Sequence, residues 1–479
     1  MSRRKNSQNS KTESRKLNKQ TWVVTLFFTL LFLFMIGYYI YFIAVDSQEI
    51  ASNAHNKRTT DIEKNIHRGT IYASGGQKLA YSNEGTTGTK NRIYPFGKKF
   101  AHVVGKVAKG KTGLEMACNN DLISSRDNPM QMIVNDFQGT KEDGSDVYTT
   151  LKVGLQKTCY NALGDRKGAV FAMNPKTGAV LASVSKPSYN PEDIDKRWNE
   201  LVNDSKNSSL VNRATQGKYT PGSIFKIFTT NEYMEENSDF KDFKYDCSGS
   251  VKVGNTRIHC FDGKSHWHEN LRESFANSCN SAFATIGMKL DPNSFRSSCE
   301  KALFNKDLPL DIEKSQSKFN LDSDSNKWDM ASTSIGQGTT TVSPAHMCMV
   351  VSAIYNKGVL MKPYFVESVV NSRDEVVKNA EPDEYKELFP EENAKVIKSY
   401  MRSVCKNGTA SMMAYSPYKA YGKTGTAELN NKDDINSWFV GFAKKGKKKI
   451  AIAVCLENIK QGEASATSVT KEILDSYFN

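Results

Sequence analysis

The sequence has no two cysteines separated by two residues, although it contains nine cysteines in all. Paired C-x-x-C motifs are typical of zinc ribbons and thioredoxin-like redox sites, so both interpretations lose their main support. The cysteines are scattered, and most are best explained as small buried hydrophobic side chains. Cys247 and Cys260 flank an expected hairpin and could form a disulfide in an oxidising compartment.

Acidic residues are almost missing from the first twenty positions, where Glu13 stands against seven lysines and arginines. This short tail carries about half of the formal net charge of +13. A nucleic-acid-binding protein instead concentrates its basic residues on one face of a folded domain. Because no such module is evident, nucleic-acid binding is not expected.

Charge is absent altogether from Trp22 to Val45, a run of 24 residues. As a helix this run would be about 36 Å long, enough to cross a hydrocarbon core of about 30 Å. A cleaved signal peptide would have a shorter apolar region that ends in small residues, whereas this run ends in bulky ones. We therefore predict a cytoplasmic basic tail over 1–20, a transmembrane signal anchor over 21–45, and an extracytoplasmic location for the rest.

Two regions of different character follow the anchor. Residues 46–147 are polar, with short apolar runs separated by glycines, and predict a small β-rich pedestal or docking module. Residues 148–479 contain an apolar hairpin near their start and three β-rich segments near their end, with helices between. Among the elements between them we expect a β-excursion over 245–270 and a helical run over 271–290. A sheet built from both ends of a domain predicts an α+β or mixed α/β fold whose sheet is mostly antiparallel.

The segment 218–228 holds the strongest candidate for chemistry. Pro221 and Gly222 break the preceding structure and an apolar, helix-compatible run follows, so Ser223 is expected at or near a helix N-terminus. Such an end favours developing negative charge. Lys226 lies three residues further on and therefore on the same helix face. A nucleophile and a potential base would thus meet within one turn.

The S-x-x-K pattern is weak evidence alone, since it occurs nine times in the chain. Lys226 can act as a base only if burial or a neighbouring cation lowers its pKa far below about 10.4. Lys423 is the candidate for that cation and for an anchor of a substrate carboxylate. Ser278 and Asn280 offer a hydroxyl for proton transfer and an amide for orienting a peptide group.

S-x-x-K with a later K-T-G is the signature of penicillin-binding proteins and serine β-lactamases. The chain resembles the first family along nearly all of its length, and its small module resembles the pedestal of the monofunctional, class B members. The segments that carry the resemblance are Arg68–Tyr72, Gly113–Glu115, Asn212–Gly217, Pro221–Lys226, Ser334–Gly338, Gly422–Glu428 and Trp438–Phe442.

The resemblance implies a membrane-anchored D,D-transpeptidase that cross-links peptidoglycan, with a β-lactamase-like domain built on a five-stranded sheet and without a cofactor or a metal. Ser223 would attack the carbonyl between two D-alanines and expel the last one, and a β-lactam would be trapped at the same step. Lys226 would be the base and Ser278 the proton relay, beside Asn280. The backbone N–H groups of Ser223 and Thr426 would form the oxyanion hole, and the substrate would be bound by Lys423, Thr424, Gly425 and Thr426.

Two departures from the family pattern are present. His266-Trp267-His268 stands where the family often has Gly-His-Gly; nothing else has metal-ligand spacing, so a surface loop is the better explanation. Residues 46–147 form a short module without room for a glycosyltransferase domain. The resemblance therefore implies a polytopic membrane glycosyltransferase of the shape or division type as partner.

Three related functions stay open. A D,D-carboxypeptidase differs only in using water as the acceptor, and a β-lactam sensor would bind without turnover. A class A β-lactamase needs a deacylating glutamate, and none is evident between Ser278 and Lys423. A role in elongation, division or sporulation, and the third residue of the stem peptide, cannot be told apart from this sequence.

Overall fold

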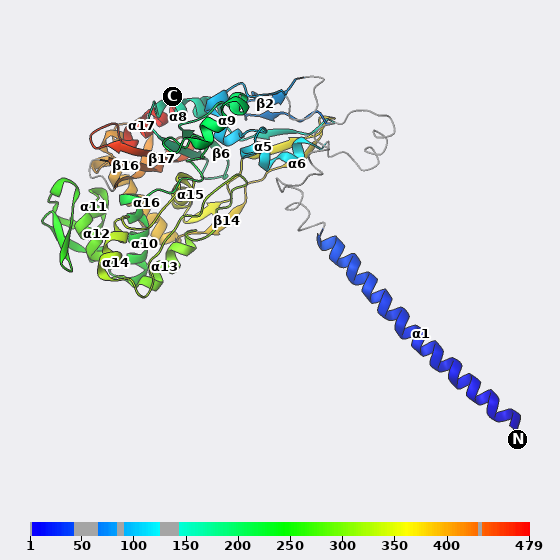
Figure 1. The fold of residues 1–479 in the computed structure, drawn as a ribbon. Coiled ribbons are helices and arrows are strands. Elements are labelled where there is room, and N and C mark those ends of the chain that lie inside the picture. Colours follow the sequence, from blue (N-terminus) through cyan, green and yellow to red (C-terminus); the bar gives the residue numbers. More distant parts are fainter. Residues whose placement is uncertain (1, 43–65, 84–90, 125–142, 430–433) are drawn as a thin grey trace. The chain divides into compact units, whose positions relative to one another are not determined.

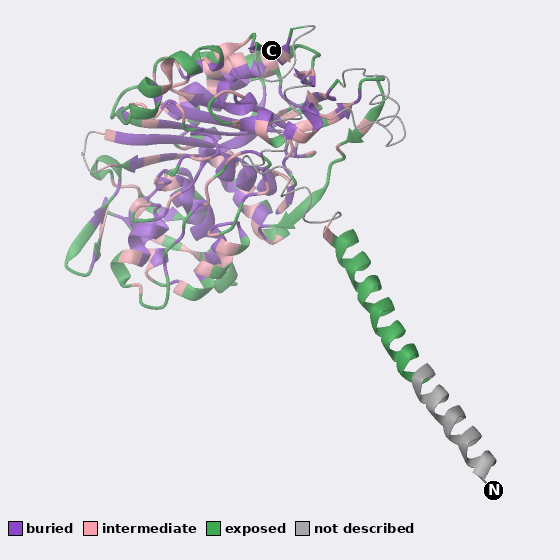
Figure 2. Ribbon diagram, turned by 45° about the vertical axis from the view of Figure 1, so that its right-hand side comes forward, coloured by how far each residue is buried: buried purple, intermediate pink, exposed green. Residues whose placement is uncertain are grey.

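The computed structural model describes residues 2–42, 66–83, 91–124, 143–429 and 434–479. The chain divides into two compact units, residues 1–61 and 62–479 (Figure 1). The first contains helix α1 (Ser2–Tyr41), whose apolar part, Lys19–Tyr41, is long and apolar enough to cross a membrane. This part is fully exposed, as Figure 2 shows. The predicted apolar helix is therefore present, although residues 43–45 lie outside the described residues.

The larger unit is organised around a five-stranded sheet with the strand order β15-β16-β17-β5-β6. Every neighbouring pair in it is antiparallel, and its strands come from the two ends of the predicted domain. The predicted antiparallel sheet is confirmed. Its strands are β5 (Gly168–Met173), β6 (Val180–Lys186), β15 (Lys419–Glu428), β16 (Asp434–Lys445) and β17 (Lys448–Lys460).

Helices cover both faces of this sheet, which explains why its central strands are apolar without alternation. One face carries α8 (Val153–Ala162) and α17 (Ala466–Phe478), and the other carries α15 (Pro344–Tyr355), as Figure 1 shows. Ser343 accepts a hydrogen bond from the His346 N–H and caps α15, whose first residue is a proline. The remaining long helices are α9 (Ile194–Asn203), α10 (Lys226–Glu236), α13 (Pro292–Lys301), α14 (Lys327–Ser334) and α16 (Glu391–Asn407).

A second, six-stranded sheet has the order β13-β12-β4-β1-β2-β3. Val147 of β4 pairs with Ile71 of β1 on one side and with Val369 of β12 on the other. The sheet therefore joins the predicted pedestal to a hairpin from far along the chain. The limits of the predicted domains are not tested by this pairing and stay a prediction. Its strands are β1 (Ile71–Tyr72), β2 (Lys78–Ser82), β3 (Arg92–Ile93), β4 (Asp146–Thr149), β12 (Val366–Val370) and β13 (Val376–Asn379).

Beside this sheet lies a buried network of two arginines and one glutamate. Arg68 Nε and Arg92 Nε each donate to one carboxylate oxygen of Glu115, both at 2.8 Å. Burial alone would raise the pKa of the Glu115 carboxyl, but Arg92 and Arg68 outweigh it and hold that pKa below its usual range. The two pedestal segments singled out in the sequence thus meet in one ion-pair network.

The segment 244–287 contains a helix break and two small sheets that the sequence did not predict. The expected helical run over 271–290 is split into α11 (Leu271–Ala276) and α12 (Asn280–Gly287). Ser278 lies in the break with a φ of +60°, a left-handed conformation that no helix interior accepts. The β-excursion before it forms two small sheets, from β7 (Lys244–Cys247) with β10 (Trp267–Asn270) and β8 (Ser250–Val253) with β9 (Thr256–His259).

Candidate active site

Ser223 lies in a short 3-10 turn, Gly222–Phe225, that leads directly into α10. Gly222 has a φ of +56°, and a Cβ there would come within 2.5 Å of the Thr426 carbonyl oxygen. Its N–H donates to the Gly336 carbonyl at 2.9 Å. Glycine is required because the turn is held between strand β15 and the loop after α14. The predicted position of Ser223 at a helix start is confirmed.

The segment before the turn is held by a tryptophan from the sheet. Trp438 of β16 donates its indole N–H to the Thr220 carbonyl at 3.1 Å. The same indole packs edge-to-face on the Tyr219 ring at a centroid distance of 6.0 Å. These contacts fix the backbone that carries the serine against the sheet.

Lys226 is completely buried, and the hydrogen-bond partners of its amine are all neutral groups. Its Nζ lies 3.0 Å from Ser223 Oγ, 2.7 Å from the Ser278 carbonyl oxygen and 2.8 Å from Asn280 Oδ1. The Phe283 ring lies 5.4 Å away on another side. Burial lowers the pKa of Lys226 to about 8. About one-tenth of this amine is therefore neutral at pH 7 and able to accept a proton.

Lys423 is the second buried cation of the site and enters from strand β15. Its Nζ donates to Ser278 Oγ at 2.8 Å and to the Thr424 carbonyl at 3.0 Å. Burial, and then repulsion from Lys226, lowers the pKa of Lys423 well below its ordinary value. The predicted pairing of two lysines is present, and burial is the main cause of both shifts.

Ser278 lies between these two lysines. Its hydroxyl oxygen is 3.2 Å from Lys226 Nζ and 2.8 Å from Lys423 Nζ. A hydroxyl has two lone pairs and one hydrogen, so when both lysines donate to it only the hydrogen is left to offer the cleft. This arrangement suits a group that gives a proton to a leaving amine.

Asn280 follows at the first position of α12. It accepts from Lys226 through Oδ1 and donates to the His259 carbonyl through Nδ2 at 3.0 Å. Both hydrogen bonds fix its amide in one orientation.

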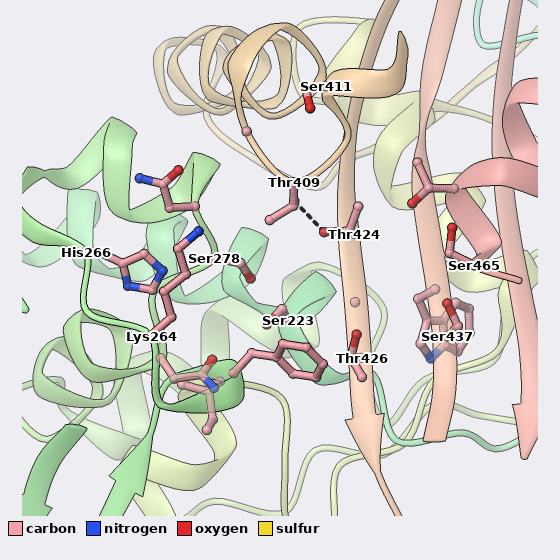
Figure 3. Close-up of a pocket in the computed structure, with 18 of the residues that line it drawn as sticks. Ser223, Lys264, His266, Ser278, Thr409, Ser411, Thr424, Thr426, Ser437 and Ser465 are labelled. Atoms are coloured by element: carbon pink, nitrogen blue, oxygen red, sulfur yellow. Dashed lines mark hydrogen bonds between the residues drawn. The ribbon is translucent and has the colours of Figure 1, made fainter. Parts of the chain in front are cut away.

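Strand β15 forms the opposite wall and is an edge strand of the five-stranded sheet. Figure 3 shows Ser223 between this strand, which carries Thr424 and Thr426, and the wall that holds Ser278. The Thr424 hydroxyl lies 2.6 Å from the hydroxyl of Thr409, which follows α16. Gly425 lies against the turn, since a Cβ there would come within 2.9 Å of the Pro221 carbonyl.

The walls enclose a cleft of about 690 Å³, open to solvent and partly polar. All the predicted site residues meet in or directly beneath it, including Ser223, Ser278 and Asn280 from the helical side. Thr409 was not predicted, because no motif marks it, and only its pairing with Thr424 shows its place. The residues of the cleft wall that the resemblance did not identify include Phe261, Lys264, His266, Asn407, Thr409, Ser411, Met412, Ser465 and Thr467.

Comparison with known proteins agrees with this geometry. The family description "Penicillin binding protein transpeptidase domain" matches residues 168–475, more than half of the chain. The chain belongs to the penicillin-binding protein transpeptidase family. The description "Penicillin binding protein A dimerisation domain" matches residues 68–147, which lie within the predicted pedestal.

Curated relatives of the family carry transpeptidase names. A protein named peptidoglycan D,D-transpeptidase PbpA from Mycolicibacterium smegmatis is 28% identical over 444 residues, covering 85% of this chain and 87% of the relative. The MrdA transpeptidase of Acinetobacter baumannii is 26% identical over 80% of this chain and 65% of its own. These matches confirm the resemblance to class B penicillin-binding proteins.

Solved structures confirm the fold. The D,D-transpeptidase domain of a peptidoglycan glycosyltransferase from Eggerthella lenta superposes with a TM-score of 0.77 at 29% identity, covering 86% of this chain and 98% of that one. Penicillin-binding protein A from Mycobacterium tuberculosis, solved as an imipenem acyl-enzyme complex, gives 0.77 at 25% identity, covering 87% of this chain and 100% of that one.

Proposed function

We propose that this protein is a serine peptidoglycan D,D-transpeptidase that cross-links stem peptides and is acylated by β-lactams. The observation that supports this most directly is the 3.0 Å separation between Ser223 Oγ and Lys226 Nζ, a buried amine whose pKa is lowered to about 8. Serine alone is a poor nucleophile at neutral pH, and a neutral amine at this distance can take its proton as it attacks.

Acylation begins when Ser223 Oγ attacks the carbonyl carbon between the two terminal D-alanines and its proton passes to Lys226 Nζ. The backbone N–H groups of Ser223 and Thr426 are proposed to stabilise the oxyanion. This is supported by the close approach of their backbones, since a Cβ on Gly222 would come within 2.5 Å of the Thr426 carbonyl oxygen.

Collapse of this intermediate breaks the C–N bond to the last D-alanine, whose amine needs a proton. Ser278 is proposed to donate it, because the two lysines occupy its lone pairs and leave its hydrogen for the cleft. Lys226, protonated in the first step, restores the hydrogen of Ser278 across 3.2 Å. In the second half of the reaction an amine of another stem peptide attacks the acyl group, and its proton passes through the same groups to Ser223 Oγ, which leaves as the ester bond breaks.

The edge of β15 is proposed to bind the donor peptide as an additional strand. An edge strand presents unpaired N–H and C=O groups, and main-chain hydrogen bonds to it give affinity. The hydroxyls of Thr424 and Thr426 and the Lys423 ammonium are proposed to bind the terminal carboxylate. Thr424 and Thr426 point into the cleft in Figure 3.

We propose that α1 anchors the protein in the cell membrane with the N-terminus in the cytoplasm and the catalytic unit outside. The apolar length of α1 and the basic residues before it support this orientation. The predicted pedestal is proposed as the docking module for a polytopic glycosyltransferase that makes the glycan strands.

Intact-mass analysis after benzylpenicillin treatment tests the nucleophile. The parent is expected to gain the mass of one ring-opened penicillin, and Ser223→Ala is expected to gain none. Ser2→Ala, at another S-x-x-K match in the tail, is the control and should acylate like the parent. Equal adducts on the parent and on Ser223→Ala would show that Ser223 is not the nucleophile.

Two further measurements separate the alternatives. A long-lived penicillin adduct excludes a β-lactamase, which would release it quickly. Incubation with a pair of stem peptides then distinguishes a transpeptidase, which forms a cross-linked dimer, from a carboxypeptidase, which only releases D-alanine. A sensor would form the adduct and neither product.

A further inference from the structure

A concentration of positive charge lies at one end of the five-stranded sheet, outside the catalytic cleft. Five of the six residues over 444–449 are lysines, and the sixth, Gly446, forms the turn between β16 and β17 with a φ of +56°. Further cations reach the same end of the sheet from β15 and α16. We call the following set the basic patch: Lys398, Arg402, Lys419, Lys444, Lys445 and Lys449.

Strand pairing aligns three of these lysines. Lys444 of β16 lies opposite Lys419 of β15 on one side and opposite Lys449 of β17 on the other. Residues directly opposite each other project from the same face of a sheet, and adjacent strands are about 4.8 Å apart. The three lysines therefore form a row across three strands. Like charges in such positions destabilise a sheet, so the row lowers stability unless an anion lies on it.

Helix α16 adds two cations on the same face. Phe442 shares this face with Lys444, because side chains two residues apart on a strand point the same way. Lys398 Nζ lies 5.5 Å from the centre of the Phe442 ring, and the Arg402 guanidinium lies 5.9 Å from that of Tyr421, which stacks on Phe442. Burial, and then repulsion from Lys444, lowers the pKa of Lys398. The helix and the strands thus direct their cations toward one another.

The patch has no counter-charge of its own. The ion pairs of the described residues engage other lysines, such as Lys460 and Lys471, and none of them includes a cation of the patch. Lys445, Lys398 and Arg402 donate instead to backbone carbonyls, at 3.1, 3.0 and 2.9 Å. The positive charge is therefore left for a partner from outside the chain.

The surface at the patch is hollowed, and the hollow continues toward the catalytic cleft. It has a volume of about 590 Å³ and is lined by four of the cations, Arg402, Lys419, Lys444 and Lys445. Residues 416–417 line it too, and they also line a second hollow. Residue 412 lines both that second hollow and the cleft. The hollows thus follow one another along the segment 411–419, from the cleft to the patch.

We propose that the basic patch binds a phosphodiester polymer of the cell envelope, with one negative charge in each repeat, beside the peptidoglycan strand in the cleft. Lysine ammonium groups on flexible stems bind phosphate groups as point charges, without a fixed geometry. A row of lysines suits a polymer whose charges repeat along its length, because each phosphate offsets the repulsion between facing lysines. The position beside the peptidoglycan strand rests on the proposed function, whereas the binding of the polymer does not.

A membrane surface is the other source of phosphate groups. Segments that bind it combine basic residues with exposed tryptophan, phenylalanine or leucine side chains. Among the described residues, no exposed large apolar side chain comes from β15, β16 or β17. Met412 and Tyr415 are exposed, but they line the second hollow on the way to the cleft. A hollow that continues into an enzyme cleft suits a polymer better than a flat bilayer.

Binding of labelled poly(glycerol phosphate) to the full chain, held in nanodiscs of uncharged phosphatidylcholine, tests the patch. The parent should bind the polymer, and the affinity should fall as salt is added, because salt screens exposed charges. The triple variant Lys419→Gln, Lys444→Gln, Lys445→Gln should bind at least about tenfold more weakly, since three exposed charge contacts are lost.

A matched control separates the patch from net charge. Lys196→Gln, Lys252→Gln and Lys289→Gln, combined in one protein, remove three exposed lysines from other parts of the folded unit. This control has the same net charge as the patch variant, keeps the basic tail and should bind like the parent. Equal weakening in the two triple variants, or no binding by the parent, would overturn the proposal.

Competition identifies the ligand chemistry. At equal negative charge, unlabelled poly(glycerol phosphate) should displace the label. Phosphatidylglycerol vesicles, the carboxylate polymer polygalacturonate and inorganic phosphate should displace much less of it. Equal displacement by the vesicles would assign the patch to a membrane surface, by polygalacturonate to any polyanion, and by phosphate to single ions. Each of these three results contradicts the proposal.

Calorimetry and acylation give readouts that do not depend on the label. The polymer should raise the melting temperature of the parent, because it binds the folded state, and should leave that of the patch variant unchanged. Without polymer, the patch variant should melt close to the parent or above it, since facing like charges are removed. A large fall in melting temperature of the patch variant would show that misfolding, and not lost charge, explains its weaker binding.

Penicillin acylation should be the same in the parent and the patch variant, because none of the three lysines lines the cleft. If the parent binds the polymer and never acylates, the proposed function fails and the polymer site remains. If the parent acylates without binding the polymer, the patch proposal alone is wrong.

Discussion

The arginine–glutamate network beside the pedestal sheet and the two lysines of the cleft both contain buried cations, but the partners of these cations differ. Arg68 and Arg92 share the carboxylate of Glu115, and each contact is a charge-assisted hydrogen bond of 2.8 Å. Lys226 and Lys423 instead share the neutral hydroxyl of Ser278. In the first cluster a carboxylate offsets part of the positive charge, whereas in the second cluster the pKa of the amines is lowered.

The difference explains what each cluster can do. An arginine-paired carboxylate stays ionised over a wide pH range, so the network can fix two segments of the chain but cannot exchange protons. Burial without a carboxylate partner lowers the pKa of both lysines, and for Lys226 it lowers it to about 8, so this amine can take a proton from a serine. Burying lysines without a carboxylate is unfavourable for stability, and such perturbed groups are common at catalytic sites.

The largest expected effect follows from removing the proposed base. Lys226→Met should slow penicillin acylation by about 10²- to 10⁴-fold, the range that a general base contributes. Its melting temperature should change little, because the relief from burying a cation offsets the acceptors left without a donor. Stopped-flow acylation and calorimetry measure both. Lys218→Met, an exposed lysine in the same segment, should match the parent, and an unchanged rate in Lys226→Met would assign the base elsewhere.

For the pedestal network we expect a loss of stability with little change in the acylation rate. Glu115→Gln leaves two buried arginines without a carboxylate and should lower the free energy of unfolding by about 3–5 kcal/mol, while acylation of the folded fraction stays near the parent's. Glu192→Gln, at an exposed carboxylate that accepts from the Tyr94 N–H, is the control and should melt like the parent.

The pH dependence of this stability has a definite sign. The pKa of Glu115 is depressed in the folded state, so its stabilisation is present above the ordinary carboxyl pKa of 4.5 and is lost as pH falls through the folded value. Denaturant melts of the parent and Glu115→Gln should therefore differ at pH 7 and converge in acid. A constant difference down to low pH would mean that the loss comes from packing.

A smaller effect is expected from pH at the cleft. With a pKa of about 8, Lys226 is about one-tenth neutral at pH 7. The acylation rate should therefore rise about tenfold between pH 7 and a plateau above pH 9, because only the neutral amine accepts the serine proton. A rate–pH profile measures this, and a flat profile would show that deprotonation of Lys226 does not limit the attack.

The smallest expected effect concerns a neutral hydrogen bond. Thr424→Val removes the contact with Thr409 and one proposed carboxylate ligand, and should lower the second-order acylation rate about fivefold, equivalent to about 1 kcal/mol. Thr409→Val removes only the contact and should have a weaker effect. Equal losses in the two variants would show that the hydroxyl pair matters, and not carboxylate binding by Thr424.

Much of the fold could be predicted because its signals are local. The apolar hairpin at β5 and β6, the capped start of α15 at Ser343 and the long apolar run of α1 each depend on neighbouring residues. The six-stranded sheet could not be predicted, since nothing near Val147 indicates that Val369 pairs with it. The break at Ser278 was also missed, because its flanks favour a continuous helix.

The candidate site shows the same division. Its motifs identified Ser223, Lys226, Ser278 and Lys423, since their spacing is characteristic of one family. Thr409 was missed because no motif marks it, and only the fold brings its hydroxyl to that of Thr424.

The sequence by itself determined which residues are proposed to carry the chemistry, the apolar run of α1 and the class of fold, because these depend on residue type and short spacing. The tertiary structure decided what those residues can do. Only burial of Lys226 within the unit lowers its pKa to about 8, and only the approach of Lys423 from strand β15 places two amines on one hydroxyl. Desolvation and long-range distance are properties of the packed chain, and no local pattern of residues contains them.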